Sequence, residues 1–587
     1  MSRKRISIVW LVLSALIILA MVMSTACAEE KGKREIKNPE TFIQDQIGDA
    51  DSLDPAYAYD TASAEQIQAI YEPLIYYDGE RTDKFKEILC TEYNVSDDGK
   101  TYRFKIRKGV KFHNGNDLTP EDVEYSFERG MVQDYVGGPQ ALILEPLLGV
   151  SHTWDDEGNI VVPLEDIKDA VEVDGDWVQF NLPTPFAPFL HVLTGSWGSI
   201  VDKEWCIAQG DWDGTQASYE ALNNPEANAT PLNDVANGTG PYKLSRWDKG
   251  VEIVLERNDD YWGKEGSIKT FIYKIVDEWT TRKLELLNGD VDHAYVPRAN
   301  IGELEGVEGL KVYKDLPQMV ADAFFFQFQI GEESTRVGSG KLDGNGIPLD
   351  FFSDLDVRLG FTYCFDWETY IQQALLGEAQ QVASPAIEGL PYRNPDQEKY
   401  SLDLAKAEEH FKAAWGGQVW EKGFKFTLLY NTGNLARQTA CQILRDNVKK
   451  VNSKFQVEVL ESQWSLILDE IFSGLVPMFQ IGWQADYPDP HNFFHPFMHS
   501  GGAYSGIQGY NNPRVDELIE EGVRETDPDA RKDIYYELQQ IYHDDAPGIM
   551  LAQILGRRYF QDWIKGYIFN PIDPSQVGHY NTLSKGY

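Results

Sequence analysis

Helices and strands alternate in the second half of the chain, and this alternation restricts the possible folds most. Amphipathic helices are predicted at residues 354–376, 404–414 and 435–451, and short apolar strand-like runs at 424–429 and 455–460. Strands that alternate with helices are typical of α/β domains. We therefore predict an α/β fold with mixed sheets flanked by helices.

The size and charge of the chain limit both its organisation and its partners. With 587 residues it is too long for one hydrophobic core, so we expect two to four domains or lobes. Its 42% of hydrophobic residues are enough to bury large cores. The formal net charge of −40 argues against nucleic acid as a partner, because phosphate binding needs clustered lysine and arginine.

The N-terminal 27 residues have the layout of a secretory signal. Basic residues at 3–5 precede an apolar run at 6–23, and three small residues lead to Cys27. Cysteine after small residues is similar to a bacterial lipobox, whose cysteine becomes lipidated, although Ser24 stands where that box usually has leucine. The alternative is an uncleaved membrane anchor, because the apolar run is nearly long enough to span a bilayer. Both versions place the rest of the chain outside the cytoplasmic membrane, with residues 28–40 as a flexible tether.

Four further cysteines are far apart in the sequence: Cys90, Cys206, Cys364 and Cys441. Since no CxxC pair occurs, a zinc ribbon is excluded. Four cysteines allow three disulfide connectivities, and isolated buried thiols are an equally good interpretation.

The segment at residues 482–490 is the strongest candidate for a binding site. It follows an apolar run at 476–481 that reads as a buried strand, and it contains two prolines that favour extended conformations in the residues before them. We therefore expect Asp486 and Asp489 on a stiff loop at a strand end, where binding residues are often displayed. A carboxylate beside Trp483 suits a cationic or hydrogen-bonding organic ligand. The alternative is a surface turn stiffened by proline.

Several sequence motifs follow one another in a specific order along the chain. They are Leu53-Asp54-Pro55 with Tyr71-Glu72-Pro73-Leu74, residues 102–115 (YRFKIRKGVKFHNG) with 118–123 (LTPEDV), 238–242 (GTGPY) with Arg257-Asn258 and Tyr261-Trp262-Gly263, Asp356-Val357-Arg358 with Asp366, and 485–490 (ADYPDP) with Asn492-Phe493-Phe494. In this order and spacing the chain, over roughly residues 40–570, resembles the extracytoplasmic solute-binding proteins of family 5. These are the oligopeptide-, dipeptide- and nickel-type binding components of ABC importers.

The resemblance implies a two-lobed clamp of type II with α/β lobes and a smaller subdomain inserted in the first lobe. Two strands would cross between the lobes, near residues 319–324 and 549–553, and form a hinge. The implied divisions are lobe I at 41–317 with an inserted subdomain at about 80–235, lobe II at 318–549, and a return to lobe I at 550–587.

The resemblance also implies a function and a site. The protein would be a monomeric carrier that captures peptides in a closing cleft and delivers them to a membrane permease. In peptide-binding relatives, an aspartate in the Trp-x-Ala-Asp context pairs with the α-ammonium of the ligand, and Trp483, Ala485 and Asp486 match this context. The peptide would add like a strand, with Gly482 and Gln484 beside it.

Other residues are assigned to the surroundings of this site. Tyr57 and Tyr59 are expected on the opposite wall of the cleft, while Asp489 and the prolines would fix the shape of the loop. No partner for the far end of the ligand is identified, and Arg437 and Arg445 are interpreted as a solvated helix face.

The sequence leaves three kinds of alternative function open. The same fold could carry an oligosaccharide, for which the 15 tryptophans offer stacking surfaces, or a metal chelate. His491, His495 and His499 have helical spacing, but Pro496 is expected to interrupt that helix. We therefore interpret the histidines as structural or as lining the cleft, and we expect no metal site and no cofactor. Asp486 and Asp489 could form the acid–base pair of a secreted hydrolase, but no HExxH, GxSxG or phosphate-binding loop occurs, so we expect no enzyme. A purely structural surface lipoprotein is the remaining class.

Overall fold

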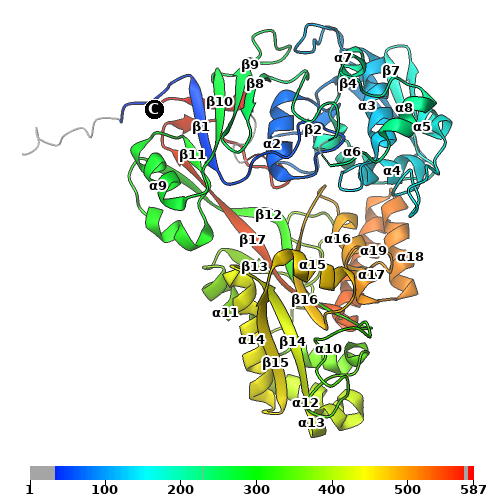
Figure 1. The fold of residues 1–587 in the computed structure, drawn as a ribbon, viewed down its shortest axis with the longest axis vertical. Coiled ribbons are helices and arrows are strands. Elements are labelled where there is room, and N and C mark those ends of the chain that lie inside the picture. Colours follow the sequence, from blue (N-terminus) through cyan, green and yellow to red (C-terminus); the bar gives the residue numbers. More distant parts are fainter. Residues whose placement is uncertain (1–33, 228, 574, 576–579) are drawn as a thin grey trace, which may run out of the picture.

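The protein consists of two lobes joined by long strands (Figure 1). The structure is a computed structural model that describes residues 34–227, 229–573, 575 and 580–587. The predicted signal and lipidation site at Cys27 therefore lie outside the described residues. Within this described part, no helix combines the length and the apolar character needed to cross a bilayer.

A nine-stranded mixed sheet runs through both lobes, in the order β16-β12-β17-β11-β1-β10-β9-β8, with β13 paired to β17. Strand β1 is parallel to β10 and β11, and the other pairs are antiparallel. The strands are β1 (Thr41–Gln46), β8 (Tyr242–Asp248), β9 (Glu252–Arg257), β10 (Thr270–Ile275), β11 (His293–Ala294), β12 (Leu310–Phe326), β13 (Ala379–Gln381), β16 (Met478–Gln484) and β17 (Gly548–Gln561).

Strands β12 and β17 connect the two lobes as one antiparallel pair. Their pairing register shifts between Tyr313 and Leu316 and again between Pro317 and Ala321. Irregular pairing of this kind bends and twists a strand pair locally. The bend lies where β12 leaves the upper lobe in Figure 1.

Lobe I carries a second, four-stranded antiparallel sheet in the order β4-β5-β7-β6. Alternating side chains of β5 are buried because one face of this sheet packs on helices. The strands are β4 (Cys90–Val95), β5 (Thr101–Ile106), β6 (Val171–Asp174) and β7 (Trp177–Asn181), with β2 (Ile75–Tyr77) and β3 (Phe85–Glu87) as a separate pair. The helices are α2 (Thr61–Ile70), α3 (Pro120–Gln133), α4 (Ala141–Leu148), α5 (Leu164–Ala170), α6 (Phe189–Val192), α7 (Lys203–Ala208), α8 (Gln216–Leu222) and α9 (Trp279–Asn288).

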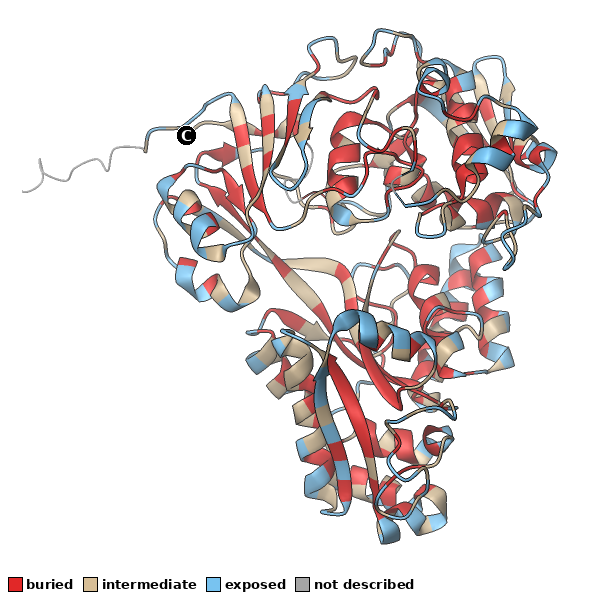
Figure 2. Ribbon diagram, in the orientation of Figure 1, coloured by how far each residue is buried: buried red, intermediate tan, exposed pale blue. Residues whose placement is uncertain are grey.

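Lobe II contains the predicted alternation of strands and helices. Strands β14 (Phe424–Asn431) and β15 (Phe455–Ser462) are parallel and are connected by α14 (Leu435–Val451). Figure 2 shows β14 buried along nearly its whole length, whereas α14 alternates between buried and exposed residues. The remaining helices are α12 (Leu404–Ala413), α13 (Gln418–Lys422), α15 (Trp464–Phe472), α16 (His491–Met498), α17 (Ser505–Gln508), α18 (Pro513–Arg524) and α19 (Pro528–Asp545).

The prediction of one continuous helix at 354–376 is wrong. The structure has α10 (Leu355–Thr362), the short α11 (Trp367–Thr369) and a π-helical turn at Tyr370–Ala374. The break occurs because Asp366 begins a new helix, where its side chain accepts a hydrogen bond from the backbone N–H of Thr369 at 3.0 Å.

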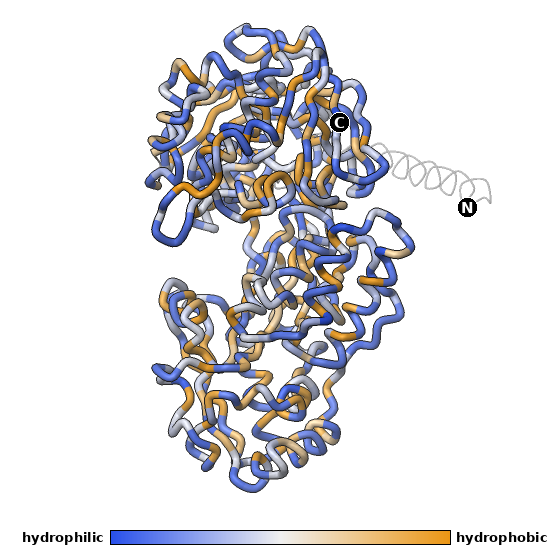
Figure 3. Tube along the Cα trace, turned by 90° about the vertical axis from the view of Figure 1, so that its right-hand side faces the viewer, coloured by the Kyte–Doolittle hydropathy of each residue, from blue (hydrophilic) through white to orange (hydrophobic). Residues whose placement is uncertain are grey.

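Each lobe has its own apolar interior. Hydrophobic segments gather inside both lobes, and hydrophilic segments are common on the outside (Figure 3). The four cysteines outside the signal region are buried and free, so the interpretation as isolated buried thiols is correct.

Candidate functional site

Strand β16 leads into the candidate segment and forms one edge of the large sheet. It extends to Gln484, beyond the predicted end of the strand. The backbone N–H of Ala485 donates to the carbonyl of Met319 at 2.8 Å, toward β12. Because backbone groups alternate in direction along a strand, those of Gly482 and Gln484 point away from β12.

Gly482 leaves room for the side chain of Asp322 on the neighbouring strand. Asp322 of β12 lies directly opposite it, and a Cβ atom on residue 482 would come within 2.3 Å of the Asp322 Oδ1 atom. Tyr504 donates its hydroxyl to the carbonyl of Gly482 at 3.0 Å. The hydroxyl of Tyr504 therefore holds the edge of β16 at Gly482.

A cavity of about 310 Å³ lies between this edge and lobe I. Its lining from lobe II is the segment Gly482 to Asp486, which includes four of the predicted site residues. From lobe I and the C-terminal segment it is lined by Tyr59, Asp60, Thr61, Ala64, Gln68, Tyr76, Tyr77, Thr194, Gly195, Ser196, Trp197 and Ile572. The structure thus brings Asp486, Trp483, Gly482, Gln484 and Tyr59 together at one cavity.

Asp486 joins the two lobes across this cavity. Tyr59 of lobe I donates its hydroxyl to Asp486 Oδ1 at 2.5 Å, and Asn492 donates its amide to Asp486 Oδ2 at 2.9 Å. The Asn492 Oδ1 atom accepts from the Asp486 backbone N–H at 2.9 Å and from Trp483 Nε1 at 3.1 Å. Burial raises the pKa of Asp486, while the hydrogen bonds from Tyr59 and Asn492 oppose that rise. A partly desolvated carboxylate of this kind binds a cation strongly.

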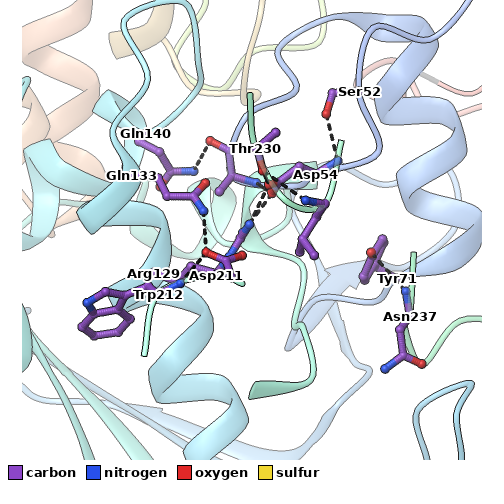
Figure 4. Close-up of polar contacts among 12 residues, drawn as sticks. Ser52, Asp54, Tyr71, Arg129, Gln133, Gln140, Asp211, Trp212, Thr230 and Asn237 are labelled. Carbon is purple, nitrogen blue, oxygen red and sulfur yellow. Dashed lines mark hydrogen bonds and ion pairs between the residues drawn. The ribbon is translucent and has the colours of Figure 1, made fainter. Parts of the chain in front are cut away.

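A buried ion-pair network lies at Asp54, five residues before Tyr59 (Figure 4). Arg129 of α3 donates to both carboxylate oxygens of Asp54 at 2.8 and 2.6 Å, and both side chains are almost completely buried. Asp54 also accepts from the backbone N–H of Ala56 at 2.9 Å, and Thr230 donates its hydroxyl to the same carboxylate. Burial alone would raise the pKa of Asp54, but the Arg129 guanidinium lowers it below its usual value.

The other end of the Arg129 guanidinium contacts a second carboxylate. Arg129 Nε donates to Asp211 Oδ2 at 2.6 Å, and Gln133, one turn further along α3, donates to Asp211 Oδ1 at 2.8 Å. Gln140 donates its amide to the carbonyl of Ala56 at 3.2 Å. The loop from Asp54 to Tyr59 is therefore tied to the helices of lobe I.

The predicted position of Tyr57 does not agree with the structure. Its side chain is 3% exposed and stacks on Tyr135, with ring centroids 4.2 Å apart, and it does not line the cavity. The backbone N–H groups of Tyr57 and Ala58 both donate to the carbonyl of Asp54, which makes a tight turn. This turn directs Tyr57 into lobe I and leaves Tyr59 at the cavity.

Asp489 is buried and does not line the cavity. Arg531 of α19 donates to both of its carboxylate oxygens at 2.6 and 2.8 Å, and Asp489 Oδ1 accepts from the backbone N–H of His491 at 2.9 Å. Burial would raise the pKa of Asp489, but Arg531 lowers it below its usual value. These contacts fix the end of the loop at the start of α16.

The two arginines of α14, Arg437 and Arg445, differ in their surroundings. Arg445 pairs with the neighbouring Asp446 at the surface. Arg437 is not simply solvated, because its guanidinium stacks on Trp464 at 4.6 Å and donates to Asn431 Oδ1 at 3.0 Å. Burial raises the pKa of Asp322, and the positive charge of Arg437 opposes that rise.

The three histidines lie at α16, and Pro496 is inside this helix and does not interrupt it. The rings of His491 and His495 are 5.4 Å apart, and those of His495 and His499 are 4.6 Å apart. Within the described ranges, no three or more His, Cys, Asp or Glu side chains are grouped so that they could hold a metal ion. Burial, with a smaller contribution from His495, lowers the pKa of His491 to about 3.

Replacing His491 by leucine should flatten the acid dependence of stability. Between pH 6.5, the usual pKa of histidine, and pH 3, His491 binds a proton in the unfolded chain but stays neutral in the folded protein. Stability therefore falls with falling pH in this window, by about 1.4 kcal/mol per pH unit for this one residue. In urea unfolding, the wild type should lose about 2 kcal/mol more than His491→Leu between pH 6.5 and pH 5. Above pH 7 the two proteins should have the same pH slope, and equal slopes below pH 6.5 would contradict the assignment.

Sequence reasoning missed several residues of the cavity. Asn492 contacts both Trp483 and Asp486, but in the sequence it was noted only as part of a motif and not predicted as a site residue. Thr61, Ala64 and Gln68 line the cavity from one face of α2, after its N-cap Asp60, and their spacing of three and four residues was the available signal. The lining residues Thr194–Trp197 gave no signal, because they belong to a loop and a short 3₁₀ turn.

The chain is similar to bacterial binding proteins over almost its whole length. It is 26% identical over 518 residues to the dipeptide-binding protein of Escherichia coli (strain K12), covering 84% of this chain and 85% of the relative. It is 25% identical over 561 residues to the oligopeptide-binding protein OppA of Bacillus subtilis (strain 168), covering 92% and 93%.

Solved structures share the fold. The binding protein DppA from Helicobacter pylori, in complex with the peptide STSA, matches with a TM-score of 0.71 and 23% identity, covering 93% of this chain and 98% of that one. AppA from Bacillus subtilis, in complex with a nonapeptide, matches with a TM-score of 0.68 and 21% identity, covering 94% and 100%. The predicted two-lobed α/β clamp is thereby confirmed. The family model described as bacterial extracellular solute-binding proteins, family 5 (middle region) matches residues 84–505, well over half of the sequence, so this chain belongs to that family of solute-binding proteins.

Proposed function

We propose that the protein is the extracytoplasmic substrate-binding component of an ABC importer, which captures peptides in the cavity between its lobes and delivers them to a membrane permease. The single observation that carries this proposal is the placement of Asp486. It lies at the end of an edge strand, inside a cavity, and accepts a hydrogen bond from the opposite lobe. The dipeptide- and oligopeptide-binding relatives support the same ligand class.

The geometry is suited to an extended peptide. The α-ammonium would bind Asp486, and the backbone would hydrogen-bond to the outward groups of β16 at Gly482 and Gln484, as in strand addition. Trp483 and Tyr59 would cover the first residue of the peptide from the two lobes. Bending of β12 and β17 would open and close the cavity.

The same proposal covers the rest of the chain. Residues 1–27 would be a signal with lipidation at Cys27, and residues 28–40 a tether that holds a monomeric carrier on the outer face of the cell membrane or in the periplasm. Lobe I would take residues 41–317, with the subdomain at about 80–235 and the return at 550–587, and lobe II residues 318–549. No catalytic activity and no cofactor are part of this role.

Asp486→Asn should weaken the binding of a tripeptide with a free N-terminus by tenfold or more, or about 1.4 kcal/mol and above, because the ammonium loses its counter-charge. Asparagine keeps an acceptor for Tyr59, so the fold should be preserved. Isothermal titration calorimetry on wild type and variant measures the change.

The N-acetylated form of the same tripeptide is the matched control. It should bind the wild type weakly, and the substitution should change its affinity little, because it carries no ammonium. An unchanged affinity of Asp486→Asn for the free peptide would contradict the proposal. Binding of a sugar or a metal chelate in place of peptides would show a different cargo.

A further inference from the structure

We infer that a contact between the lobes outside the cavity acts as a latch, which favours the closed form and so strengthens the binding of every peptide by the same factor. The latch consists of residues 185–188 of lobe I and the C-terminal end of α18 in lobe II. This inference rests on the proposed function and assigns part of the affinity to residues that do not line the cavity.

A backbone hydrogen bond joins the two parts of the latch. The N–H of Ala187 donates to the carbonyl of Val523 at 2.8 Å. Val523 lies in the last turn of α18, where backbone carbonyls have no donor within the helix. The preceding carbonyl, of Gly522, accepts from Arg531 of the same lobe at 2.6 Å. The end of α18 is therefore completed partly by its own lobe and partly by lobe I.

Apolar side chains pack together at the same place. Val523 is 8% exposed and belongs to the apolar cluster of lobe I, although α18 is part of lobe II. Phe186 is in this cluster as well, and its ring meets that of His491 edge to face, with the centroids 5.9 Å apart. Separation of the lobes would expose these apolar surfaces to water, which costs free energy.

The turn between β4 and β5 adds a third contact between the lobes. A Cβ atom on Gly99 would lie 3.1 Å from the Cγ2 atom of Thr526, which follows α18. The two lobes therefore approach each other closely on both sides of Val523, from the turn at Gly99 and from the segment at Ala187.

The latch and the hinge lie at different places between the lobes. In Figure 1, α18 is at the right-hand side of lobe II, whereas β12 and β17 cross between the lobes nearer the centre. Phe186, Ala187 and Val523 do not line the cavity. A rotation of the lobes about β12 and β17 would separate the latch as it opens the cavity. The latch contacts thus belong to the closed form alone.

The part of the latch in lobe I is stiff before it meets α18. Pro185 and Pro188 fix their own φ angles and restrict the residues before them. The carbonyl of Phe186 accepts from the backbone N–H of Phe189 at 3.0 Å and from the hydroxyl of Tyr102 at 3.4 Å. Little conformational entropy is therefore lost on contact, so that the contact favours closure.

The latch should act on all ligands alike. A ligand enclosed between the lobes has an apparent dissociation constant that varies inversely with the fraction of closed protein. Because the latch residues are outside the cavity, a change in them alters this fraction and leaves the contacts of the ligand unchanged. Every peptide should then lose affinity by one common factor.

The test is Val523→Ser, measured by isothermal titration calorimetry with two tripeptides, Ala-Ala-Ala and Ala-Phe-Ala. Both dissociation constants should rise by the same factor, about tenfold, the size expected for the loss of one buried valine side chain. The milder variant Val523→Ala should raise both by a smaller common factor. Urea unfolding shows that each variant is folded before its binding is measured.

Val162→Ser is the matched control variant. Val162 is also 8% exposed and belongs to the same apolar cluster, but it is itself a residue of lobe I. This variant should lose stability and keep both affinities. The inference is wrong, and the proposed function stands, if Val523→Ser keeps both affinities, if it weakens the two peptides by different factors, or if Val162→Ser weakens them equally. If the wild type binds neither peptide, the proposed function is wrong as well.

Discussion

Arg129→Ala is expected to lower the free energy of unfolding by about 3–5 kcal/mol, the effect of removing one partner of a buried ion pair. The substitution leaves Asp54 and Asp211 buried without their cation, and both accept hydrogen bonds from Arg129 in the folded protein. Urea unfolding at neutral pH measures the loss. Arg514→Ala is the control, because Arg514 is an exposed arginine that also contacts two carboxylates, of Glu517 and Glu537, and its loss should change stability by less than about 1 kcal/mol.

Acid should weaken the Arg129 network in the wild type. The pKa of Asp54 is lower in the folded protein than in the unfolded chain, so its ion pair adds stability above the usual carboxyl pKa, and this stability is lost as the pH falls through the folded value. Arg129→Ala should remove that part of the acid dependence. A variant with wild-type stability at neutral pH would mean that the network does not support the loop before Tyr59.

Local patterns explain which parts of the fold could be predicted. The unit of β14, α14 and β15 follows from periodicity over a few residues, and the structure contains it. The break between α10 and α11 was missed because one aspartate side chain, Asp366, ends one pattern and begins another. The relative placement of the lobes came from the family resemblance, since no local pattern contains it.

The site was predictable only where neighbours in sequence are neighbours in space. Asp486 and Trp483 lie in one short segment, and both line the cavity. Arg129 contacts Asp54 and Asp211 from 75 and 82 residues away, and no spacing in the sequence indicates such a pair. Tyr57 and Tyr59 look equivalent as residues, and only the turn after Asp54 decides which one reaches the cavity.

The buried pair of Asp489 and Arg531 allows stability and binding to be separated. Asp489→Ala should lower the free energy of unfolding by about 3–5 kcal/mol, because it leaves Arg531 buried and uncompensated. The double variant Asp489→Leu with Arg531→Met should recover part of this loss, because apolar side chains can replace a buried ion pair, although the carbonyl of Gly522 loses its donor Arg531. Urea unfolding of the three proteins gives these differences.

Peptide binding should not recover in the same double variant. Asp489 also accepts a hydrogen bond from the backbone N–H of His491, and this contact fixes the loop to α16. Asp489→Leu removes the contact only three residues after Asp486. We expect the double variant to fold and to bind a tripeptide several-fold more weakly than the wild type. Wild-type affinity in a stable double variant would mean that the prolines and Asn492 alone hold Asp486 in place. Stability and affinity measured on the same samples therefore decide whether this ion pair serves the fold alone or also the position of the carboxylate that binds the ligand.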